Sequence, residues 1–356
     1  LLGPRQVGKS TLLKKRFPDQ RLYNLMEADT FRQLSTAPER IRQTLTENDR
    51  FLIIDEIQRL PSLLNEVQVI LDTFPDKRAI LTGSSARKLR RGNANLLGGR
   101  AFFLNLFPLT TAELGVDRWE TMLSRGSLPR VIDSTIYWEE LKSYVNIYLS
   151  EEIRAEALTR SIENFSRFLH LCGHLNACQL NYTKLGSDAQ IPPRTIKDYV
   201  DILRDTLVAD TLVPLKSGRK TVSKEKFYLF DIGVAHFLNG RKTIARGTPE
   251  YGQALEHLVF LEIKAYLSYC RKDLSLHYWR TRDQLEIDFI VDQRTGIEVK
   301  ASSQISHRDT KALRLTDLTL QQKIVVCTEP EPRRVDDIDI MPVADFLTAL
   351  WSGKLF

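Results

Sequence analysis

The chain has 356 residues, of which 42% are hydrophobic and 27% charged, a composition typical of globular proteins and unlike that of disordered or rod-like chains. No apolar run approaches the roughly 20 residues that span a bilayer, so a membrane protein is not expected. Four scattered cysteines and the absence of a secretory signal favour a reducing, cytoplasmic compartment. The chain begins at Leu1 without an initiator methionine, which leaves room for a missing N-terminal segment.

Charge is distributed unevenly along the chain, whose net charge is +6. Residues before Ala245 include 36 basic and 28 acidic side chains, whereas the remaining residues include 15 and 17. A basic body beside a mildly acidic tail suggests a polyanion partner held mainly by the first part. The alternative is an ordinary solvated surface, and charge alone does not decide between the two.

The apolar pattern of the first half predicts an α/β fold. Residues 1–113 alternate strand-like and helical stretches, as in a parallel sheet, with strands at Arg21–Asn24, Phe51–Asp55, Ala79–Thr82 and Ala101–Leu104. Residues 114–161 have a helical pattern and are expected to form a small lid.

Two further modules are predicted after the lid. Residues 162–240 are expected to form three helices and then two strands, at Ala209–Leu215 and Lys226–Phe230. Residues 245–356 are expected to open with a long helix, Leu255–Tyr269, and to continue with strands at Leu276–Arg280, Leu285–Val291 and Gly296–Lys300.

A phosphate-binding loop lies at the start of the chain, where Gly-Pro-Arg-Gln-Val-Gly-Lys-Ser-Thr fits the spacing G-x-x-x-x-G-K-[ST]. Its glycines let successive backbone N–H groups turn inward around phosphate oxygens, and the next helix points its positive N-terminus at the same anion. Lys9 is expected to reach the β- and γ-phosphates, and the Ser10 hydroxyl to bind Mg²⁺. The predicted nucleotide-binding residues are Gly3, Pro4, Arg5, Gln6, Val7, Gly8, Lys9, Ser10 and Thr11.

Two carboxylates end the apolar strand Phe51–Asp55 and point to hydrolysis. An acid at the carboxyl end of a parallel strand lies beside the phosphate loop of a neighbouring strand. Asp55 is expected to hold Mg²⁺ through water, and Glu56 to polarise the attacking water as a general base. A P-loop kinase needs no such second carboxylate, so the pair favours hydrolysis over phosphorylation of a small molecule. The alternative for Glu56 is a surface acid at a strand end.

The strand Ala79–Thr82 and the basic residues after it supply further candidates. A hydroxyl at the strand tip is expected to touch the γ-phosphate or the attacking water, with Ser84 the first choice and Thr82 the reserve. Arg100 is the candidate for an arginine that stabilises γ-phosphate charge across a subunit junction, with an ordinary surface arginine as the alternative. The basic cluster at residues 87–91 is expected either to contact nucleic acid or to be solvated.

Residues 1–112 resemble the AAA-type ATPases, and more specifically the prokaryotic P-loop ATPases fused to a C-terminal domain of unknown function, the AAA_14 plus DUF4143 arrangement. The resemblance is carried by Gly-Pro-Arg-Gln-Val-Gly-Lys-Ser, Ile-Ile-Asp-Glu-Ile-Gln, Leu-Thr-Gly-Ser-Ser and Leu-Gly-Gly-Arg, and similar cues continue through nearly the whole chain. It implies that the nucleotide is ATP, which spacing alone does not distinguish from GTP. Only Leu1-Leu2 represent the strand that precedes the loop in this group, so adenine contacts from upstream are not assigned.

Residues 162–231 resemble a winged helix. Tyr182–Ala189 is expected to be the supporting helix, and Arg194–Leu207 the helix that such folds present to DNA. The second of these helices and the basic loop between the two strands give the predicted DNA contacts, which are Arg194, Lys197, Arg204, Lys216, Arg219, Lys220 and Lys224. Lys226 is counted in the same basic loop. The alternative is a helical protein-interaction module with a solvated loop.

The last module has the D…(E)-x-K spacing of the restriction-endonuclease-like nuclease fold, also written PD-(D/E)XK. Two strands joined by a turn are expected to bring Asp288 and Glu298 together, with Glu298 and Lys300 on one face because side chains alternate along a strand. The two acids are predicted to hold Mg²⁺, Lys300 to orient a water, and Glu256 matches the auxiliary acid of this fold. The alternatives are a domain that binds DNA without cutting it and a hairpin with no metal.

These features predict an ATP-hydrolysing protein that uses ATP and Mg²⁺, binds duplex or branched DNA, and assembles as a homo-oligomer such as a hexameric ring. The leading hypothesis is a DNA-processing motor or switch with a metal-dependent nuclease module. The runner-up is a signalling or scaffold ATPase whose C-terminal fold binds without cleaving. A third hypothesis is a nuclease whose ATPase only gates access.

Overall fold

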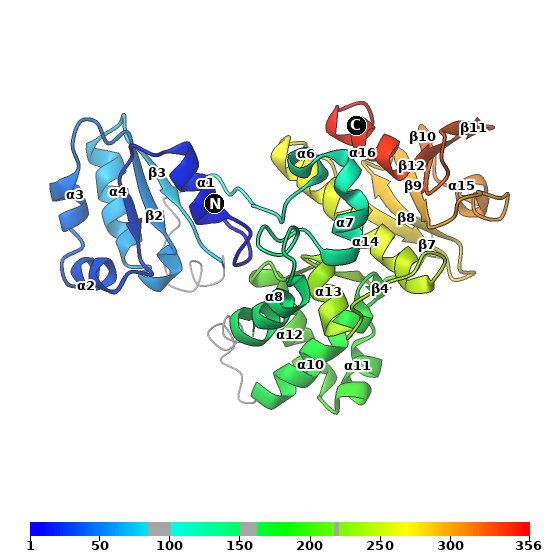
Figure 1. Ribbon diagram of the computed structural model, residues 1–356, viewed down its shortest axis with the longest axis horizontal. Coiled ribbons are helices and arrows are strands. Elements are labelled where there is room, and N and C mark those ends of the chain that lie inside the picture. Colours follow the sequence, from blue (N-terminus) through cyan, green and yellow to red (C-terminus); the bar gives the residue numbers. More distant parts are fainter. Residues whose placement is uncertain (85–100, 150–161, 217–220) are drawn as a thin grey trace. The chain divides into compact units, whose positions relative to one another are not determined.

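A computed structural model describes residues 1–84, 101–149, 162–216 and 221–356 (Figure 1). The chain divides into two compact units, which are described separately. The N-terminal unit comprises Leu1–Phe107 with Asp205–Val208, and the C-terminal unit comprises Pro108–Arg204 with Ala209–Phe356. Both units mix helices and strands, so the predicted α/β class is confirmed. In the described parts of the chain, no helix combines the length and the apolar character needed to cross a bilayer.

The N-terminal unit is built on a parallel sheet in the order β1-β2-β3, as predicted. Its strands are β1 (Leu22–Asn24), β2 (Phe51–Asp55) and β3 (Arg78–Leu81). Asn24 lies opposite Asp55, and Ile54 lies opposite Leu81, so the carboxyl ends of all three strands share one edge. Leu2 adds parallel bridges to Gly83 and Asn105, which brings the phosphate loop to the same edge.

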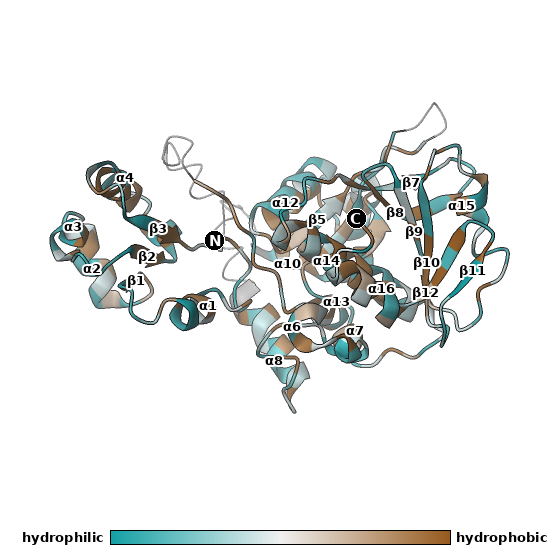
Figure 2. Cartoon of the chain, turned by 90° about the horizontal axis from the view of Figure 1, so that it is seen from above, coloured by the Kyte–Doolittle hydropathy of each residue, from teal (hydrophilic) through white to brown (hydrophobic). Residues whose placement is uncertain are grey.

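The helices of this unit are α1 (Lys9–Arg16), α2 (Ala28–Thr36), α3 (Arg40–Thr44), the short η1 (Ile57–Arg59) and α4 (Leu63–Thr73). Strand β2 is an aliphatic run buried on both faces, as expected for the centre of a parallel sheet. Helix α4 buries the residues that recur at helical spacing, Leu63, Leu64, Val67 and Ile70. Figure 2 shows the hydrophobic residues gathered on β2 and β3.

The predicted strand at Ala101–Leu104 was wrong. Residues 101–104 belong to no strand. The segment pairs only at its end, where Asn105 forms an isolated bridge with Leu2 through hydrogen bonds from the Leu2 N–H to the Leu104 carbonyl oxygen and from the Leu106 N–H to the Leu2 carbonyl oxygen. Phe102 is 88% exposed and Phe103 is 52% exposed. These apolar side chains therefore lack the burial that normally stabilises a strand of this composition.

The C-terminal unit begins with short helices where the sequence predicted a lid. These are α6 (Thr111–Leu114), η3 (Val116–Arg118), α7 (Trp119–Arg125), α8 (Tyr137–Ser143) and the π-helical η4 (Tyr144–Leu149). Met122 and Leu123 of α7 share a core with helix α14 of the C-terminal unit, so α7 packs with that unit. Residues 150–161 of the predicted lid lie outside the described residues.

A helical region with a three-stranded antiparallel sheet follows. Its elements are α10 (Ile162–Leu175), β4 (Cys178–Gln179), α11 (Tyr182–Ala189), α12 (Pro193–Asp205), β5 (Ala209–Leu212), β6 (Lys226–Leu229) and α13 (Ile232–Leu238), with strand order β4-β6-β5. The Asn181 side chain caps α11 by accepting a hydrogen bond from the backbone of Lys184. Helix α12 starts at proline, which is tolerated in the first turn.

The chain ends in a six-stranded mixed sheet of order β11-β12-β10-β9-β8-β7. Its strands are β7 (Leu276–Arg280), β8 (Glu286–Val291), β9 (Thr295–Lys300), β10 (Gln322–Cys327), β11 (Arg333–Val335) and β12 (Ile338–Pro342). Helices α14 (Pro249–Tyr269) and α16 (Val343–Trp351) share a core with one face of the sheet, and α15 (Lys311–Leu315) shares a core with the other. The predicted start of α14 at Leu255 was six residues late, because Thr248 caps the helix and Pro249 opens it.

Candidate functional site

The phosphate loop joins Leu2, beside strand β3, to helix α1. Gly8 has a φ of 100° and Gln6 a φ of 62°, both in the left-handed region, so the chain turns twice before the helix begins. A Cβ on Gly3 would lie 2.5 Å from the Leu106 carbonyl oxygen, so only glycine fits there. The Nζ atom of Lys9 is buried in the loop and donates to the carbonyl oxygens of Gly3 at 2.8 Å and Pro4 at 2.9 Å.

The carboxylate of Asp55 lies against this loop. Its Oδ2 accepts a hydrogen bond of 2.6 Å from the Ser10 hydroxyl, although the two residues are 45 positions apart. Its Oδ1 accepts a hydrogen bond from the Thr82 hydroxyl, and that hydroxyl accepts from the backbone N–H of Glu56 at 3.0 Å. The hydroxyl groups of Ser10 and Thr82 therefore hold the Asp55 carboxylate in contact with the start of α1.

Glu56 follows β2 in a left-handed conformation, with a φ of 61°. A non-glycine residue in that region is uncommon, and strained backbone of this kind clusters at functional sites. The side-chain amide of Gln58 donates both to the Glu56 carboxylate and, at 3.1 Å, to the Ser84 hydroxyl. Gln58 thus links the candidate general base, Glu56, to the candidate hydroxyl that follows β3, that of Ser84.

The structure brings most of the predicted nucleotide-site residues to this edge and adds a residue to them. Ser84, the first-choice hydroxyl, reaches Glu56 through Gln58, whereas the reserve, Thr82, contacts Asp55 directly. Gln58 was not singled out for a role, although it stands in the Asp-Glu-Ile-Gln motif. Arg100 and the basic residues at 87–91 lie outside the described residues.

The residues present fit a bound magnesium–nucleotide. A buried lysine amine faces the loop carbonyls, a helix begins directly after the loop, and a serine hydroxyl touches an aspartate. Lysine and the helix N-terminus suit phosphate oxygens, while hydroxyl and carboxylate oxygens are ligands that Mg²⁺ prefers. The same set is the one that P-loop enzymes use.

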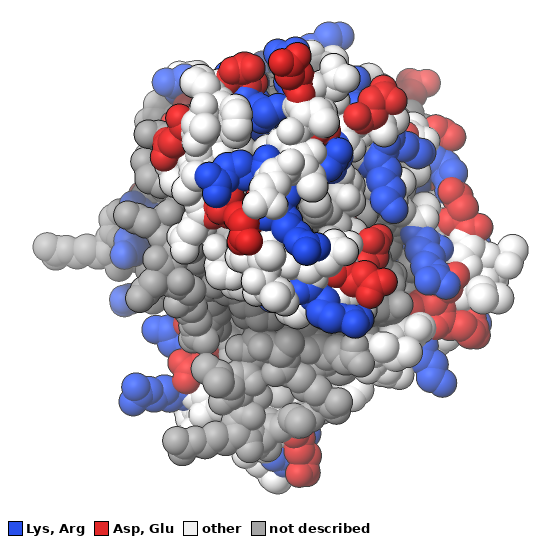
Figure 3. Space-filling model, turned by 90° about the vertical axis from the view of Figure 1, so that its left-hand side faces the viewer, with Lys and Arg blue, Asp and Glu red and all other residues white. Residues whose placement is uncertain are grey.

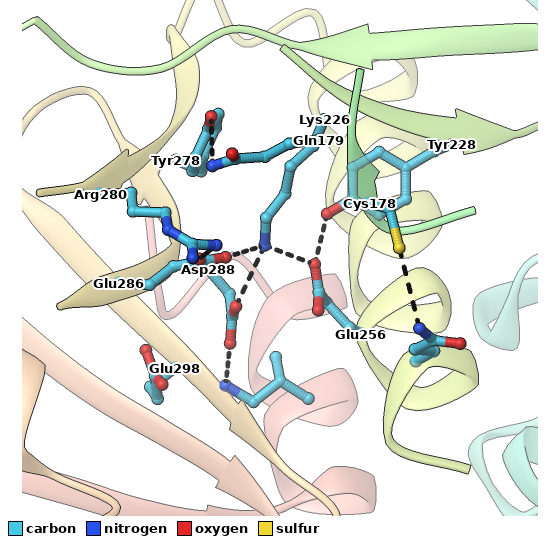
Figure 4. Close-up of polar contacts among 12 residues, drawn as sticks. Cys178, Gln179, Lys226, Tyr228, Glu256, Tyr278, Arg280, Glu286, Asp288 and Glu298 are labelled. Carbon is cyan, nitrogen blue, oxygen red and sulfur yellow. Dashed lines mark hydrogen bonds and ion pairs between the residues drawn. The ribbon is translucent and has the colours of Figure 1, made fainter. Parts of the chain in front are cut away.

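A second group of carboxylates gathers in the C-terminal unit (Figure 4). Glu256 comes from α14, Glu286 and Asp288 from one face of β8, and Glu298 with Lys300 from one face of β9. Asp288 Oδ2 accepts a hydrogen bond of 2.9 Å from the backbone N–H of Val299, and Lys300 pairs with Glu298 Oε1. The three predicted acids, Glu256, Asp288 and Glu298, therefore meet Glu286 where α14 faces the β8–β9 hairpin.

Lys226 lies in the middle of these acids, which the sequence did not predict (Figure 4). Its Nζ atom is 2.8 Å from Glu256 Oε1 and 3.4 Å from Asp288 Oδ1, and it also pairs with Glu286. Its side chain is only 3% exposed. The prediction that placed Lys226 in the basic, DNA-facing loop was therefore wrong. Lys226 opens strand β6, where alternation places it on the same face as Tyr228, and that pattern was the available signal.

Neighbouring groups complete the cluster. The Tyr228 hydroxyl donates to Glu256 Oε1 at 2.6 Å, and Arg280 pairs with Glu286 Oε2 at 2.6 Å. Lys226 Nζ lies 5.4 Å from the centre of the Tyr278 ring. Four carboxylates thus face three cationic side chains, those of Lys226, Arg280 and Lys300.

The pKa values of the cluster follow from its burial and its pairs. Burial, joined by the charge of Asp288, raises the pKa of Glu256 to about 7 against the opposing attraction of Lys226. Burial and the Asp288 charge also raise the pKa of Glu298 well above its usual value. Burial acts to lower the pKa of Lys226, but the surrounding carboxylates, led by Glu256, hold it well above the usual range. The carboxylates likewise raise the pKa of Lys300 to about 12 despite its burial.

This second site does not fit a divalent metal as it stands. The ammonium group of Lys226 already contacts Glu256 and Asp288, two of the three predicted ligands. Glu298 Oε2 is buried and has no hydrogen-bond partner among the described residues, but it is one atom and not a ligand set. In the described part of the chain, no group of three or more histidine, cysteine, aspartate or glutamate side chains is arranged to hold a metal ion.

The predicted DNA-contacting residues that the structure describes are all exposed, and they are Arg194, Lys197, Arg204, Lys216 and Lys224. Arg204 lies 3.8 Å from Asp201 and 4.0 Å from Glu225, so part of its charge is balanced. Arg219 and Lys220 lie outside the described residues. Where the face shown in Figure 3 is made of described residues, lysine and arginine are interspersed with acidic residues and no single-sign patch dominates.

Known protein families match the chain in three consecutive regions. Residues 1–115 match an AAA domain. Residues 116–244 match a domain of unknown function (DUF8612), and residues 251–346 match another (DUF4143). The first boundary lies close to the division between the two compact units at Phe107.

Bacterial proteins resemble the chain over most of its length. Uncharacterized proteins of Mycobacterium tuberculosis (Rv2008c) and Mycobacterium bovis (Mb2031c) are each 26% identical over 343 residues, covering 92% of this chain and 75% of the relative. An uncharacterized protein of Haemophilus influenzae is 21% identical over 370 residues, covering 97% of this chain and 88% of the relative. The similarity to each relative extends over more than nine-tenths of this chain, and the names of the relatives specify no activity.

Proposed function

Since the chain joins an AAA domain to a DUF4143 domain, as its motifs predicted, we propose that it is an ATP-hydrolysing protein that couples ATP turnover to DNA binding. The observation that carries the proposal is the 2.6 Å hydrogen bond between Ser10 and Asp55 beside the buried amine of Lys9. It joins the phosphate loop to the carboxyl end of β2, the arrangement from which P-loop enzymes hold Mg²⁺ and a triphosphate.

Each residue of the nucleotide site has a distinct role in this proposal. Ser10 and Asp55 would hold Mg²⁺, and Lys9 would contact the phosphates. The bound ion supplies charge neutralisation at the phosphoryl group. Glu56 orients and deprotonates the attacking water, and Gln58 positions the Glu56 carboxylate relative to Ser84.

The DNA-binding part of the proposal rests on the middle region. Its element order is helix α10, strand β4, helices α11 and α12, then strands β5 and β6, which is the order of a winged helix. Arg194 and Lys197 on α12 are exposed, as phosphate-contacting side chains must be. Asp198 and Asp201 follow them on the same helix and partly balance their charge, so we expect weak, salt-sensitive binding that positions a duplex without reading its sequence.

The proposal includes assembly of several copies. Phe102 and Phe103 lie two and three residues after Arg100 and are 88% and 52% exposed. Adjacent exposed aromatic residues are uncommon on a solvated surface and favour contact with another surface. A junction at this segment would let Arg100 of one copy act on the nucleotide of the next.

A second function, that of a signalling or scaffold ATPase whose C-terminal domain binds without cleaving, is favoured by the ion pairs of Lys226. These pairs use two of the three carboxylates that a metal-dependent nuclease would need. We therefore propose DNA binding, and not DNA cleavage, as the contribution of the C-terminal unit in this state.

The two functions are separated by ATP turnover measured alone and with duplex, forked and single-stranded DNA. Strong stimulation by one of these DNAs supports the DNA-coupled ATPase. Turnover that is measurable but indifferent to all three supports the scaffold. Absence of turnover under every condition, with intact nucleotide binding, contradicts the proposal of an ATPase.

A further inference from the structure

The carboxylate cluster of the C-terminal unit already contains a cation, the ammonium group of Lys226. An ammonium group has three N–H donors and no acceptor. Lys226 meets three carboxylates, those of Glu256, Glu286 and Asp288, and its side chain is 3% exposed. Each donor thus has an anionic acceptor, and water has little access to the group.

The position of Lys226 is fixed by the strand that carries it. Tyr228, two residues further along β6, donates to Glu256 and stacks on Phe260 of α14 with ring centres 4.0 Å apart. The Leu229 backbone N–H donates to the Asn176 side chain at 3.0 Å, and the Leu229 carbonyl oxygen accepts from the His257 ring. Asn176 also contacts His257 at 3.0 Å. These contacts hold β6 against α14, so Lys226 is not a surface lysine that has folded inward.

A divalent ion at the same place would be repelled by this ammonium group. Two cations a few ångströms apart repel strongly where water is excluded. The pairs with Arg280 and Lys300 reduce the remaining negative charge still further. Among these acids, Glu298 keeps a buried oxygen, Oε2, that has no hydrogen-bond partner in the described part of the chain and that could coordinate a metal replacing the lysine.

We propose that Lys226 is the resident cation of the Glu256–Glu286–Asp288 cluster and that it excludes divalent metal from the C-terminal unit while β6 is paired to α14. The cluster then joins the middle region to the C-terminal sheet through ion pairs and performs no metal-dependent cleavage. Glu256, Asp288 and Glu298 are not arranged to hold a metal while Lys226 is present. Removing the ammonium group should let these three acids move together and form a metal site. This inference does not depend on ATP hydrolysis.

The test is a titration of Mn²⁺ into the full chain without nucleotide, followed by calorimetry, for the wild type and Lys226→Met. Lys224→Met is the matched control, because Lys224 lies on the same segment and is exposed. We expect Lys226→Met to bind Mn²⁺ at least about tenfold more tightly than the wild type, the scale on which neighbouring groups alter metal affinity. Lys224→Met should match the wild type, and adding Asp288→Asn to Lys226→Met should abolish the gain.

Either of two results in this titration would overturn the proposal. One is Mn²⁺ binding by the wild type that Asp288→Asn removes. The other is a folded Lys226→Met variant with no gain in Mn²⁺ affinity. If Lys226→Met does not fold, the double variant Lys226→Met with Glu256→Gln replaces it, because it removes one carboxylate together with its counter-charge. This double variant should still show a gain that depends on Asp288 and Glu298, and its absence in folded protein also contradicts the proposal.

Plasmid cleavage supplies a second measurement on the same proteins. The wild type is expected to leave supercoiled DNA intact with Mn²⁺. Cleavage by the wild type that Glu298→Ala abolishes would show that a metal enters despite Lys226 and would overturn the proposal.

Discussion

The two carboxylate sites of the chain contain similar acids but hold them with different partners. Asp55 and Glu56 of the N-terminal unit accept hydrogen bonds from hydroxyl and amide groups, those of Ser10, Thr82 and Gln58. The acids of the C-terminal unit pair with the ammonium and guanidinium groups of Lys226, Arg280 and Lys300. Neutral donors orient a carboxylate without cancelling its charge, whereas cations cancel it. Acids at the right spacing therefore indicate a metal site only when their counter-charges are also known.

The largest expected effect is at Glu56, which is proposed to act as the general base of ATP hydrolysis. Replacing Glu56 by Gln should lower ATP turnover by about 10²- to 10⁴-fold, the usual contribution of a general base, and leave ATP binding intact. Turnover and nucleotide affinity are measured separately, with the exposed Glu47→Gln as the control. Undiminished turnover in Glu56→Gln would remove the assigned role of this residue and weaken the contrast between the sites.

The next effect concerns stability at the C-terminal cluster. Replacing Lys226 by Ala should lower the free energy of unfolding by about 3–5 kcal/mol, because it leaves buried carboxylates without their counter-charge. Denaturant unfolding of the C-terminal unit, monitored by the buried Trp279, measures the change. The exposed Lys224→Ala should change it by less than about 0.5 kcal/mol. Equal stability of the two variants would mean that the Lys226 pairs contribute little.

The nucleotide site and the cluster also differ in how much of each was predictable. Gly3 to Thr11 and Asp55 are short, ordered motifs, and their geometry follows from a parallel sheet whose strands end at one edge. Strand and helix boundaries were also close wherever the apolar pattern was regular, as at Tyr182–Ala189 and Leu276–Arg280.

The remaining features depend on contacts between distant segments. Lys226 is 30 residues from Glu256 and 62 from Asp288, so its position at the start of a predicted strand does not by itself indicate which acids it meets. The strand predicted at Ala101–Leu104 failed for a related reason, since a strand requires a partner as well as apolar residues. Gln58 is an intermediate case, since it stands in a recognised motif but its link to Ser84 requires the fold.

A smaller effect is expected at Gln58, whose neutral amide group is proposed only to orient the Glu56 carboxylate. Replacing Gln58 by Ala removes one hydrogen bond to a carboxylate, worth about 1.5–3 kcal/mol, so kcat should fall by roughly 10- to 100-fold. KM for ATP should stay unchanged, because Gln58 is proposed to position the base and not the nucleotide. Gln68→Ala, which removes an amide that donates to Asp72 on α4, is the control. A rise in KM with unchanged kcat would instead assign Gln58 to nucleotide binding.

The most gradual effect is the pH dependence of stability around β6. Burial lowers the pKa of His257 from 6.5 to about 3, so the folded protein keeps this ring neutral while the unfolded chain protonates it. His257 therefore contributes stability that is complete above about pH 6.5 and is lost as pH falls towards 3, with a slope of at most about 1.4 kcal/mol per pH unit. Glu256 acts in the opposite sense, because its raised pKa of about 7 gives stability that is present below about pH 4.5 and lost as pH rises through 7.

The two contributions oppose each other between about pH 4.5 and 6.5, so the effect of His257 is best isolated between pH 3 and 4.5. Unfolding free energies measured across that window should rise less steeply with pH in His257→Gln than in the wild type. The exposed His307→Gln should reproduce the wild-type slope. If the slope is unchanged in His257→Gln, the ring is not held neutral between α14 and β6, and the anchoring of Lys226 by this strand loses one of its supports.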